Sequence, residues 1–454
     1  MTGTLAAGGD LAATVREELA RWTVPGAAVG VLRDGEVETA GYGVASLRTG
    51  QPATGDTLFR VGSISKLFTA TLVMTAVDEG KLGLDTPIAA YLPDLRLADE
   101  AARRAITPRH LLSHQSGLYG DFFEDHGWGE DALARAIGRF HTLRQVTAPG
   151  ELWTYCNAGF HLLGAAVARV LGTTFEAAMR ERVFAPLGLA HTTYYLHEAV
   201  VHPFAVGHNQ TEPGGDEHEV APQYYPRNRN PAGGVISTAG DLLAFAAFHL
   251  GDGMANGARV LREATLRAMR EPQVRAGNFA HWYGLGWAIE TIGDTTVIGH
   301  GGTTSGFQAH LTLVPARRFA LAILTNSARG SAAIRGIERR ALARFCDLER
   351  AEPATVALAP AALARLAGRY AQPQTEITVT VADGDLRLAA VAKRSPLRDA
   401  DTPLPPQRLR PIGEHQFVVV GGEGDGARVD FIPGPDGRPR FIRAGGRLAE
   451  RVVE

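Results

Sequence analysis

Residues 59–70 read FRVGSISKLFTA and place Ser63 and Lys66 three positions apart at the start of an apolar run. Such a run is typical of a buried helix that begins at Ser63. Side chains three positions apart share one face of a helix, so the Lys66 amine can reach the Ser63 hydroxyl. A serine hydroxyl is a poor nucleophile without a neighbouring base, and burial against Leu67 and Phe68 would lower the pKa of the lysine. Ser63 is therefore a candidate nucleophile and Lys66 its candidate base, although by themselves the two residues also fit an N-cap serine and a surface lysine.

A second stretch, residues 149–160, reads PGELWTYCNAGF and places Tyr155 two positions before Asn157 at the start of a helical run. A phenol can pass protons on, and an amide side chain can hold a substrate amide or the lysine. By themselves these residues also fit a core aromatic and a helix cap. The pattern predicts a catalytic role only in combination with the first stretch.

A third stretch, residues 299–307, reads GHGGTTSGF and follows a predicted strand over 295–298. Gly301 and Gly302 allow a substrate backbone to lie close to this edge. The backbone N–H of Thr303, together with that of Ser63, is a candidate oxyanion hole. His300 is a candidate for orienting a carboxylate or the phenol. Alone, the stretch also fits a glycine-rich turn with a chance histidine.

The three stretches, in this order, resemble the serine β-lactamase and penicillin-binding-protein superfamily. Ser63 and Lys66 match its Ser-x-x-Lys box, 155–157 match a Tyr-x-Asn box, and 300–302 stand where many relatives carry Lys-Thr-Gly. Further matches are residues 109–118 (RHLLSHQSGL), 184–189 (FAPLGL) and 231–241 (PAGGVISTAGD). The resemblance covers about residues 10–345. It is strongest to the class C β-lactamase, D-aminopeptidase and esterase branch, and extends to stand-alone penicillin-binding-protein-type thioesterases that cyclise peptides.

The length of 454 residues predicts more than one folded unit. Strand patterns lie at both ends of the first part, over 27–32 and 36–42 around an Asp34-Gly35 turn, and over 307–314 and 319–325. A helix is predicted over 331–348. We expect an α/β catalytic domain over 1–349 with an all-α subdomain inserted at about 80–220, and the resemblance implies a β-lactamase/transpeptidase-like fold. Residues 209–229 read as a long loop.

The last part of the chain has short strand patterns separated by turn residues, over 378–381, 386–391, 416–420, 428–432 and 440–443. This spacing predicts a small antiparallel sheet or barrel over 361–454. Residues 350–360 read as a linker. The resemblance implies that this part is a lipocalin-like β-barrel near the mouth of the active site.

The composition adds weaker constraints. The formal net charge is −2 and no basic run occurs, so we expect neither nucleic acid nor a membrane as partner. Without a secretory pattern, an apolar run of about 20 residues or a cysteine framework, the cytoplasm is favoured. No cofactor or metal site is expected, and His110 and His114 are read as structural. Candidate pocket-lining residues are Trp153, Tyr224, Tyr225, Arg227 and Trp287, each of which also fits an ordinary core or loop position.

The resemblance implies an acyl-enzyme on Ser63, and His300 in place of a lysine disfavours β-lactams as substrates. The preferred hypothesis is a stand-alone thioesterase that releases and macrocyclises nonribosomal peptides ending in a D-residue, delivered as a peptidyl thioester that a carrier protein can bear. The alternative is a D-stereospecific aminopeptidase, amidase or esterase with water as acceptor. A third reading, a silent peptide-binding protein, is disfavoured by the intact motifs.

Overall fold

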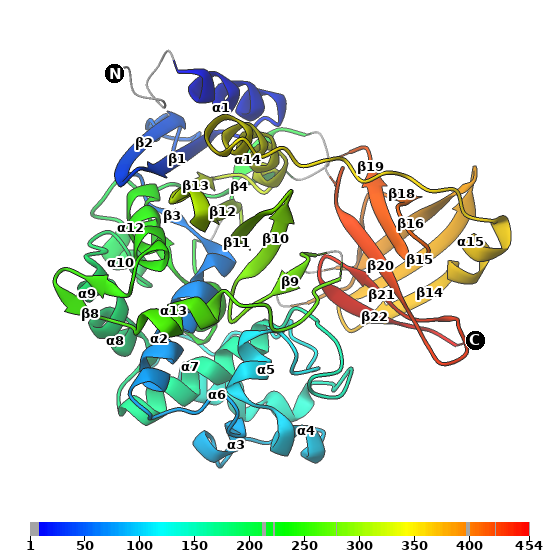
Figure 1. Cartoon of the computed structure of the whole chain (residues 1–454), viewed down its shortest axis with the longest axis horizontal. Coiled ribbons are helices and arrows are strands. Elements are labelled where there is room, and N and C mark those ends of the chain that lie inside the picture. The colour runs from blue at the N-terminus through cyan, green and yellow to red at the C-terminus, as the bar shows by residue number, and fades with distance from the viewer. Residues whose placement is uncertain are drawn as a thin grey trace.

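The computed structural model describes residues 9–210, 215–220, 223–277, 279–395, 400–422 and 424–453. Its larger part is built around an antiparallel sheet of seven strands in the order β2-β1-β13-β12-β11-β10-β9 (Figure 1). The strands are β1 (Gly26–Arg33), β2 (Glu36–Gly43), β9 (Trp282–Tyr283), β10 (Ala288–Ile292), β11 (Thr295–Thr304), β12 (Phe307–Val314) and β13 (Phe319–Thr325). Strands from both ends of this part share the sheet, as the sequence predicts.

Helices cover both faces of this sheet. Alternating side chains of β1 point to opposite faces, so Val29 packs under one set of helices and Ala28 under the other. One face is covered by α1 (Asp10–Arg21) and α14 (Gly330–Cys346), which lie together in Figure 1. The other face is covered by α2 (Ser65–Asp78) and α12 (Ala239–Leu250).

The chain between α2 and the second half of the sheet is largely helical and lies on the α2 side (Figure 1). Its helices are α3 (Ile88–Tyr91), α4 (Glu100–Ala105), α5 (Pro108–Leu112), α6 (Ala132–Gly138), α7 (Asn157–Leu171), α8 (Phe175–Met179), α9 (Ala185–Leu187), α10 (Leu196–Ala199), α11 (Asn230–Gly233) and α13 (Glu263–Met269). Short paired strands connect them: β3 (Phe59–Arg60) with β6 (Ile236–Ser237), β4 (His208–Gln210) with β5 (Glu217–Glu219), and β7 (Met254–Ala255) with β8 (Ala258–Arg259). The predicted loop over 209–229 therefore contains the β4–β5 hairpin, although residues 211–214 and 221–222 lie outside the described residues.

The C-terminal part is a closed antiparallel barrel of eight strands. Each strand pairs with its neighbours along the chain, and the last closes on the first. The strands are β14 (Gly368–Gln372), β15 (Thr375–Ala382), β16 (Asp385–Ala392), β18 (Gln407–Pro411), β19 (Gln416–Val420), β20 (Arg428–Pro433), β21 (Pro439–Ala444) and β22 (Arg447–Arg451), with β17 (Thr402–Pro403) appended to β16 and α15 (Pro360–Leu366) ahead of β14. Its interior is filled by side chains such as Tyr370, Phe417 and Phe431.

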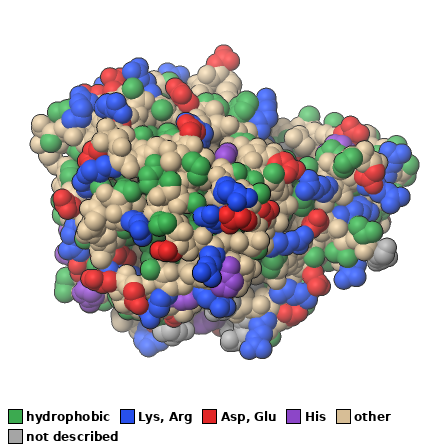
Figure 2. Space-filling view, turned by 90° about the horizontal axis from the view of Figure 1, so that it is seen from below, with side chains coloured by type: hydrophobic (Ala, Val, Ile, Leu, Met, Phe, Trp, Pro, Cys, Tyr) green, Lys and Arg blue, Asp and Glu red, His purple; other side chains and the backbone are tan. Residues whose placement is uncertain are grey.

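The barrel is the smaller of two lobes (Figures 1 and 2). It lies beside the β9–β10 end of the sheet (Figure 1). The core of the barrel is separate from the two cores that flank the sheet. We propose residues 350–360 as the linker between a catalytic domain and a barrel domain. Acidic and basic side chains are interspersed on the face in Figure 2, in keeping with the small net charge.

Among the described residues, no single helix has the length and apolar composition needed to cross a membrane, and one bent pair, Asn157–Leu171 with Phe175–Phe184, passes that test jointly.

Candidate active site

Ser63 lies on a single 3-10 turn, η1 (Gly62–Ile64), that leads directly into α2. Gly62 has a φ of +51°, a conformation that favours glycine, and it turns the chain from β3 into the helix. Ser63 is half-buried, whereas every other residue from Phe59 to Ala70 is buried. The Ser63 side chain is therefore the one in this segment that is accessible from the surface.

Lys66 is completely buried, and its Nζ lies 3.0 Å from Ser63 Oγ and 2.6 Å from the carbonyl oxygen of Ala232. Burial holds the pKa of Lys66 well below its usual value, and the positive charge of Arg447 lowers it further. A neutral amine can donate to Ala232 and still accept the Ser63 proton. The position and the lowered pKa both suit Lys66 to be a general base.

Tyr155 meets the same hydroxyl from the other side, because its side chain is hydrogen-bonded to that of Ser63. The Lys66 Nζ lies 5.0 Å from the centre of the Tyr155 ring. Burial raises the pKa of Tyr155 above its usual value, and this outweighs the lowering effects of Ser63 and Arg447. The phenol is therefore protonated in the resting site, and Lys66 is the group that is ready to take a proton.

Asn157 begins α7 and donates from Nδ2 to Asp121 Oδ1 over 2.8 Å. The preceding residue, Cys156, caps the helix, since its Sγ accepts the Gly159 N–H at 3.3 Å. Asn157 is therefore neither the helix cap nor, among the contacts of the described residues, a partner of Lys66. It instead fixes the Asp121 carboxylate beside the site.

Arg447, the first residue of β22 in the barrel, supplies the positive charge next to Tyr155. Its Nε and Nη2 lie 3.0 and 3.1 Å from the two Asp121 carboxylate oxygens, and its guanidinium carbon lies 4.8 Å from the centre of the Tyr155 ring. Arg447 lowers the pKa of Asp121 against the effect of burial, so the carboxylate stays ionised. The sequence motifs indicated neither residue. No local signal connects them, because they are 326 positions apart.

The glycine cluster 299–302 is part of strand β11 rather than a turn, and it runs against the Ser63 turn. A Cβ placed on Gly302 would lie 1.9 Å from the Val61 carbonyl oxygen and 3.2 Å from the Ser63 nitrogen. A Cβ placed on Gly62 would lie 2.7 Å from the Thr303 nitrogen. The backbones of the Ser63 turn and of β11 are therefore in close contact at Gly62, Gly302 and Thr303. A shared oxyanion hole stays a prediction.

His300 is buried in β11, with Nδ1 2.5 Å from the carbonyl oxygen of Gly301. Its ring centre lies 6.1 Å from that of Tyr155. Burial, with the charge of Lys66, lowers the pKa of His300 to about 3. His300 is therefore neutral at physiological pH and does not replace the charge of a lysine at this position. Its Nε2 is buried and has no hydrogen-bond partner among the described residues, so the orienting role stays a prediction.

The pocket-lining candidates fall in different places. The hydroxyl of Tyr225 lies beside α11, since a Cβ placed on Gly233 would be 2.5 Å from it. Tyr224 is exposed and donates to Asp125 on the outer rim. The guanidinium of Arg227 forms an ion pair of 3.0 Å with buried Glu176.

Trp153 is only 1% exposed, so its indole lies beneath the protein surface. Phe279 stacks on its indole at 4.9 Å and is itself 42% exposed. Phe279, which no sequence motif indicated, is the aromatic side chain presented next to Tyr155, with ring centres 6.3 Å apart.

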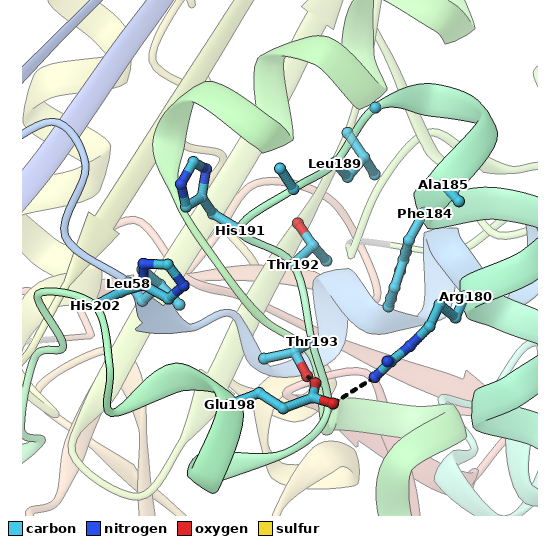
Figure 3. A pocket seen from close by; sticks show the side chains of 12 residues that line it. Leu58, Arg180, Phe184, Ala185, Leu189, His191, Thr192, Thr193, Glu198 and His202 are labelled. Carbon is cyan, nitrogen blue, oxygen red and sulfur yellow. Dashed lines mark hydrogen bonds and ion pairs between the residues drawn. The ribbon is translucent and has the colours of Figure 1, made fainter.

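A separate cavity of about 460 Å³ holds none of these residues (Figure 3). His191 and His202 stand on one side and the Arg180–Glu198 ion pair on another (Figure 3). Among the described residues, no cluster of three or more histidine, cysteine or acidic side chains could hold a metal ion.

Comparison with known proteins shows the family of the chain. A profile of the Beta-lactamase family matches residues 11–345, and the chain belongs to this family. Penicillin-binding protein 4 of Amycolatopsis lactamdurans is 37% identical over 363 residues, which cover 76% of this chain and 93% of the relative. The family is of the serine hydrolase and acyltransferase type.

Two solved structures extend the likeness. SurE superposes with a TM-score of 0.75 and 30% identity over 97% of this chain and 98% of its own, so the likeness includes the barrel. SurE has also been solved with D-Leu. The D-amino acid amidase of Ochrobactrum anthropi, complexed with L-phenylalanine amide, has a TM-score of 0.60 and 25% identity over 73% of this chain and 98% of its own.

Proposed function

We propose that this protein forms an acyl-enzyme on Ser63 from a peptidic thioester that ends in a D-residue, and that it releases the peptide as a macrolactam. One observation carries the acyl-enzyme step: a buried lysine of lowered pKa and a protonated tyrosine flank a half-exposed serine hydroxyl. The chemistry needs a base, an acid and an oxyanion hole, and no further group.

The first half-reaction uses Lys66 as base. Neutral Lys66 takes the Ser63 proton while Oγ forms a bond to the thioester carbonyl carbon. The backbone N–H groups of Ser63 and Thr303 hold the negative charge on the carbonyl oxygen. The carbon–sulfur bond then breaks, and Tyr155 donates its proton to the departing sulfur. Lys66 then gives the proton that it took from Ser63 to the Tyr155 oxygen, which restores the phenol. The product is an ester between the peptide and Ser63.

The second half-reaction runs through the same groups in the opposite direction. The amine at the other end of the peptide attacks the ester carbon and gives up a proton to the Tyr155–Lys66 pair. The carbon–oxygen bond breaks and Ser63 Oγ recovers the proton, which leaves a cyclic amide. Water in place of the amine would give the linear acid.

The preference for a D-residue and for cyclisation is supported by the comparisons and not by a contact in this chain. SurE shares both lobes with this protein and has been solved with D-Leu. The amidase likeness covers the catalytic part and supports the alternative, a D-stereospecific amidase or esterase that uses water. Delivery of the substrate by a carrier protein belongs to the first proposal only.

A linear peptidyl thioester mimic with a C-terminal D-residue tests the proposal. We expect an acyl adduct on Ser63 by intact-mass spectrometry and a cyclic product that is lighter than the linear acid by one water. The epimer with a C-terminal L-residue should react at least ten times more slowly. Linear acid as sole product supports the hydrolase, and no adduct on the folded protein contradicts both enzymatic functions.

A further inference from the structure

His114 follows the end of α5 and holds the backbone on both sides of Tyr155. The Thr154 N–H donates to the His114 carbonyl oxygen over 3.0 Å. The Cys156 N–H donates to His114 Nδ1 over the same distance. The amide between them, that of Tyr155, donates to the carbonyl oxygen of Gly446 in the barrel over 2.9 Å. Three successive amides are thus fixed, two of them by one residue.

The imidazole of His114 also forms the floor under the Tyr155 ring. The two ring centres lie 4.4 Å apart with 36° between the planes. Tyr283 and Phe160 close the other sides of the imidazole at 5.0 and 5.3 Å. His114 is fully buried, so its ring has no freedom to move away from the phenol.

The backbone of His114 adopts a left-handed conformation. Its φ is +57°, which is uncommon for a residue with a side chain and costs conformational free energy. This conformation lets the carbonyl oxygen and the imidazole of one residue reach the same strand segment. Because Nδ1 accepts a hydrogen bond, the ring proton is on Nε2 and the imidazole is neutral. Burial, and then the charge of Lys66, keep the pKa of His114 well below its usual value.

We propose that His114 is a positioning residue, which holds the Tyr155 phenol in hydrogen-bond reach of Ser63. The inference rests on the proposed function only in that Tyr155 takes part in acyl transfer. The sequence analysis expected a structural role for His114. The proposal makes that role the positioning of one side chain, Tyr155.

Two substitutions separate this role from packing. Asparagine and glycine both accept a positive φ and both remove the ring, but only asparagine places an acceptor near the position of Nδ1. We expect His114→Asn to keep more than a third of the wild-type rate of Ser63 acylation by a nitrophenyl ester of a D-amino acid. His114→Gly should lose at least twentyfold in that rate with little change in KM. His110→Asn, on α5, serves as the control and should react at the wild-type rate.

Hydrogen exchange supplies a readout that needs no substrate. The amides of Thr154 and Cys156 should exchange at least tenfold faster in His114→Gly than in His114→Asn. Equal acylation rates and equal exchange in the two variants, with both folded by circular dichroism, would overturn the proposal. If the wild-type protein forms no adduct while exchange follows the expected order, the proposed function fails and the positioning role stands.

Discussion

Asp121 and Arg447 join the two lobes at the active site, with two hydrogen bonds of 3.0 and 3.1 Å between carboxylate and guanidinium. Asp121 also accepts from Asn157, and the guanidinium lies over the Tyr155 ring. The backbone carbonyl of Asp121 accepts a further bond from Gln374, at the turn between β14 and β15. The barrel is therefore bonded to the catalytic residues directly and is more than a cover for the pocket.

Arg447 belongs to the barrel and lowers the pKa of Lys66, so we expect the barrel to influence how the acylation rate varies with pH. Acylation requires neutral Lys66, so its rate should rise as pH passes upward through the lowered pKa of Lys66. Arg447 lowers that pKa, whereas Asp121 raises it. Arg447→Gln should move the rising limb of the pH–rate profile to higher pH. Below the limb, the rate should fall about tenfold for each pH unit by which the limb moves, because the neutral fraction of Lys66 falls tenfold.

Arg447→Lys is the matched control, because it keeps a positive charge near Asp121. Its limb should lie between those of the wild type and Arg447→Gln. Single-turnover acylation from about pH 5 to pH 10 measures all three. An unchanged limb in Arg447→Gln would mean that the arginine does not control the charge of Lys66.

Ser63 and Ser65 are two positions apart and should respond in opposite ways to substitution by alanine. Ser63→Ala should abolish the acyl adduct and leave the melting temperature nearly unchanged, because the hydroxyl carries chemistry rather than packing. Ser65 Oγ is buried, donates to Gly62 O at 2.7 Å and accepts from Val235 N at 2.9 Å. Ser65→Ala should still form the adduct but cost about 1–3 kcal/mol of stability. Mass spectrometry and thermal melting of the same samples decide both.

Gly301 and Gly302 offer a test of the oxyanion hole. Gly302→Ala would bring a methyl group within 1.9 Å of the Val61 carbonyl oxygen and close to the Ser63 nitrogen. We expect it to reduce kcat by about 10²-fold or more, the range for a lost oxyanion donor. A methyl group on Gly301 meets only His310 Nδ1 at 3.5 Å and the Ala309 carbonyl oxygen at 3.9 Å. Gly301→Ala should therefore stay within a few-fold of wild type, and similar losses in both variants would count against this oxyanion hole.

The pair of His310 and Glu338, between β12 and α14, predicts a pH-dependent stability. Its closest atoms are 3.3 Å apart. Although burial opposes it, Glu338 raises the pKa of His310 above 6.5, and His310 helps to lower that of Glu338 below 4.5. The histidine contribution is complete below 6.5 and is lost as pH rises through the raised pKa. The carboxylate contribution is complete above 4.5 and is lost as pH falls through the lowered pKa.

The variant His310→Gln should therefore differ most from wild type between pH 4.5 and 6.5. The loss should stay below the ~3–5 kcal/mol typical of a broken buried pair, since Thr312 and Arg350 still contact the carboxylate. Denaturant melts at about pH 5.5 and pH 9 measure it. A difference between the two proteins that is the same at both values would show that charge is not involved.

Local patterns in the sequence predicted the residues proposed to react. The sequence did not reveal the residues that surround them, because these pair with residues far away along the chain. Ser63 and Lys66 come together because a turn of helix joins them, and the hairpin of β1 and β2 follows from its Asp34-Gly35 turn. The pairing of Asp121 with Arg447 depends on how the barrel docks, which no short stretch encodes.

The barrel strands likewise divide into those that a local pattern predicts and those that it does not. The predicted strand over 416–420 matches β19, because its apolar run is uninterrupted. Strands β14, β18 and β22 were missed, since they carry arginine or proline and bury few apolar side chains. Their identity as strands comes from closure of the barrel and not from propensity.

Strand β22, residues 447–451, closes the barrel against β14 and also carries the guanidinium that faces Asp121. Without β22, the rest of the chain has neither a closed barrel nor the countercharge for Asp121. One strand therefore serves both the closure of the barrel and the charge balance of the active site.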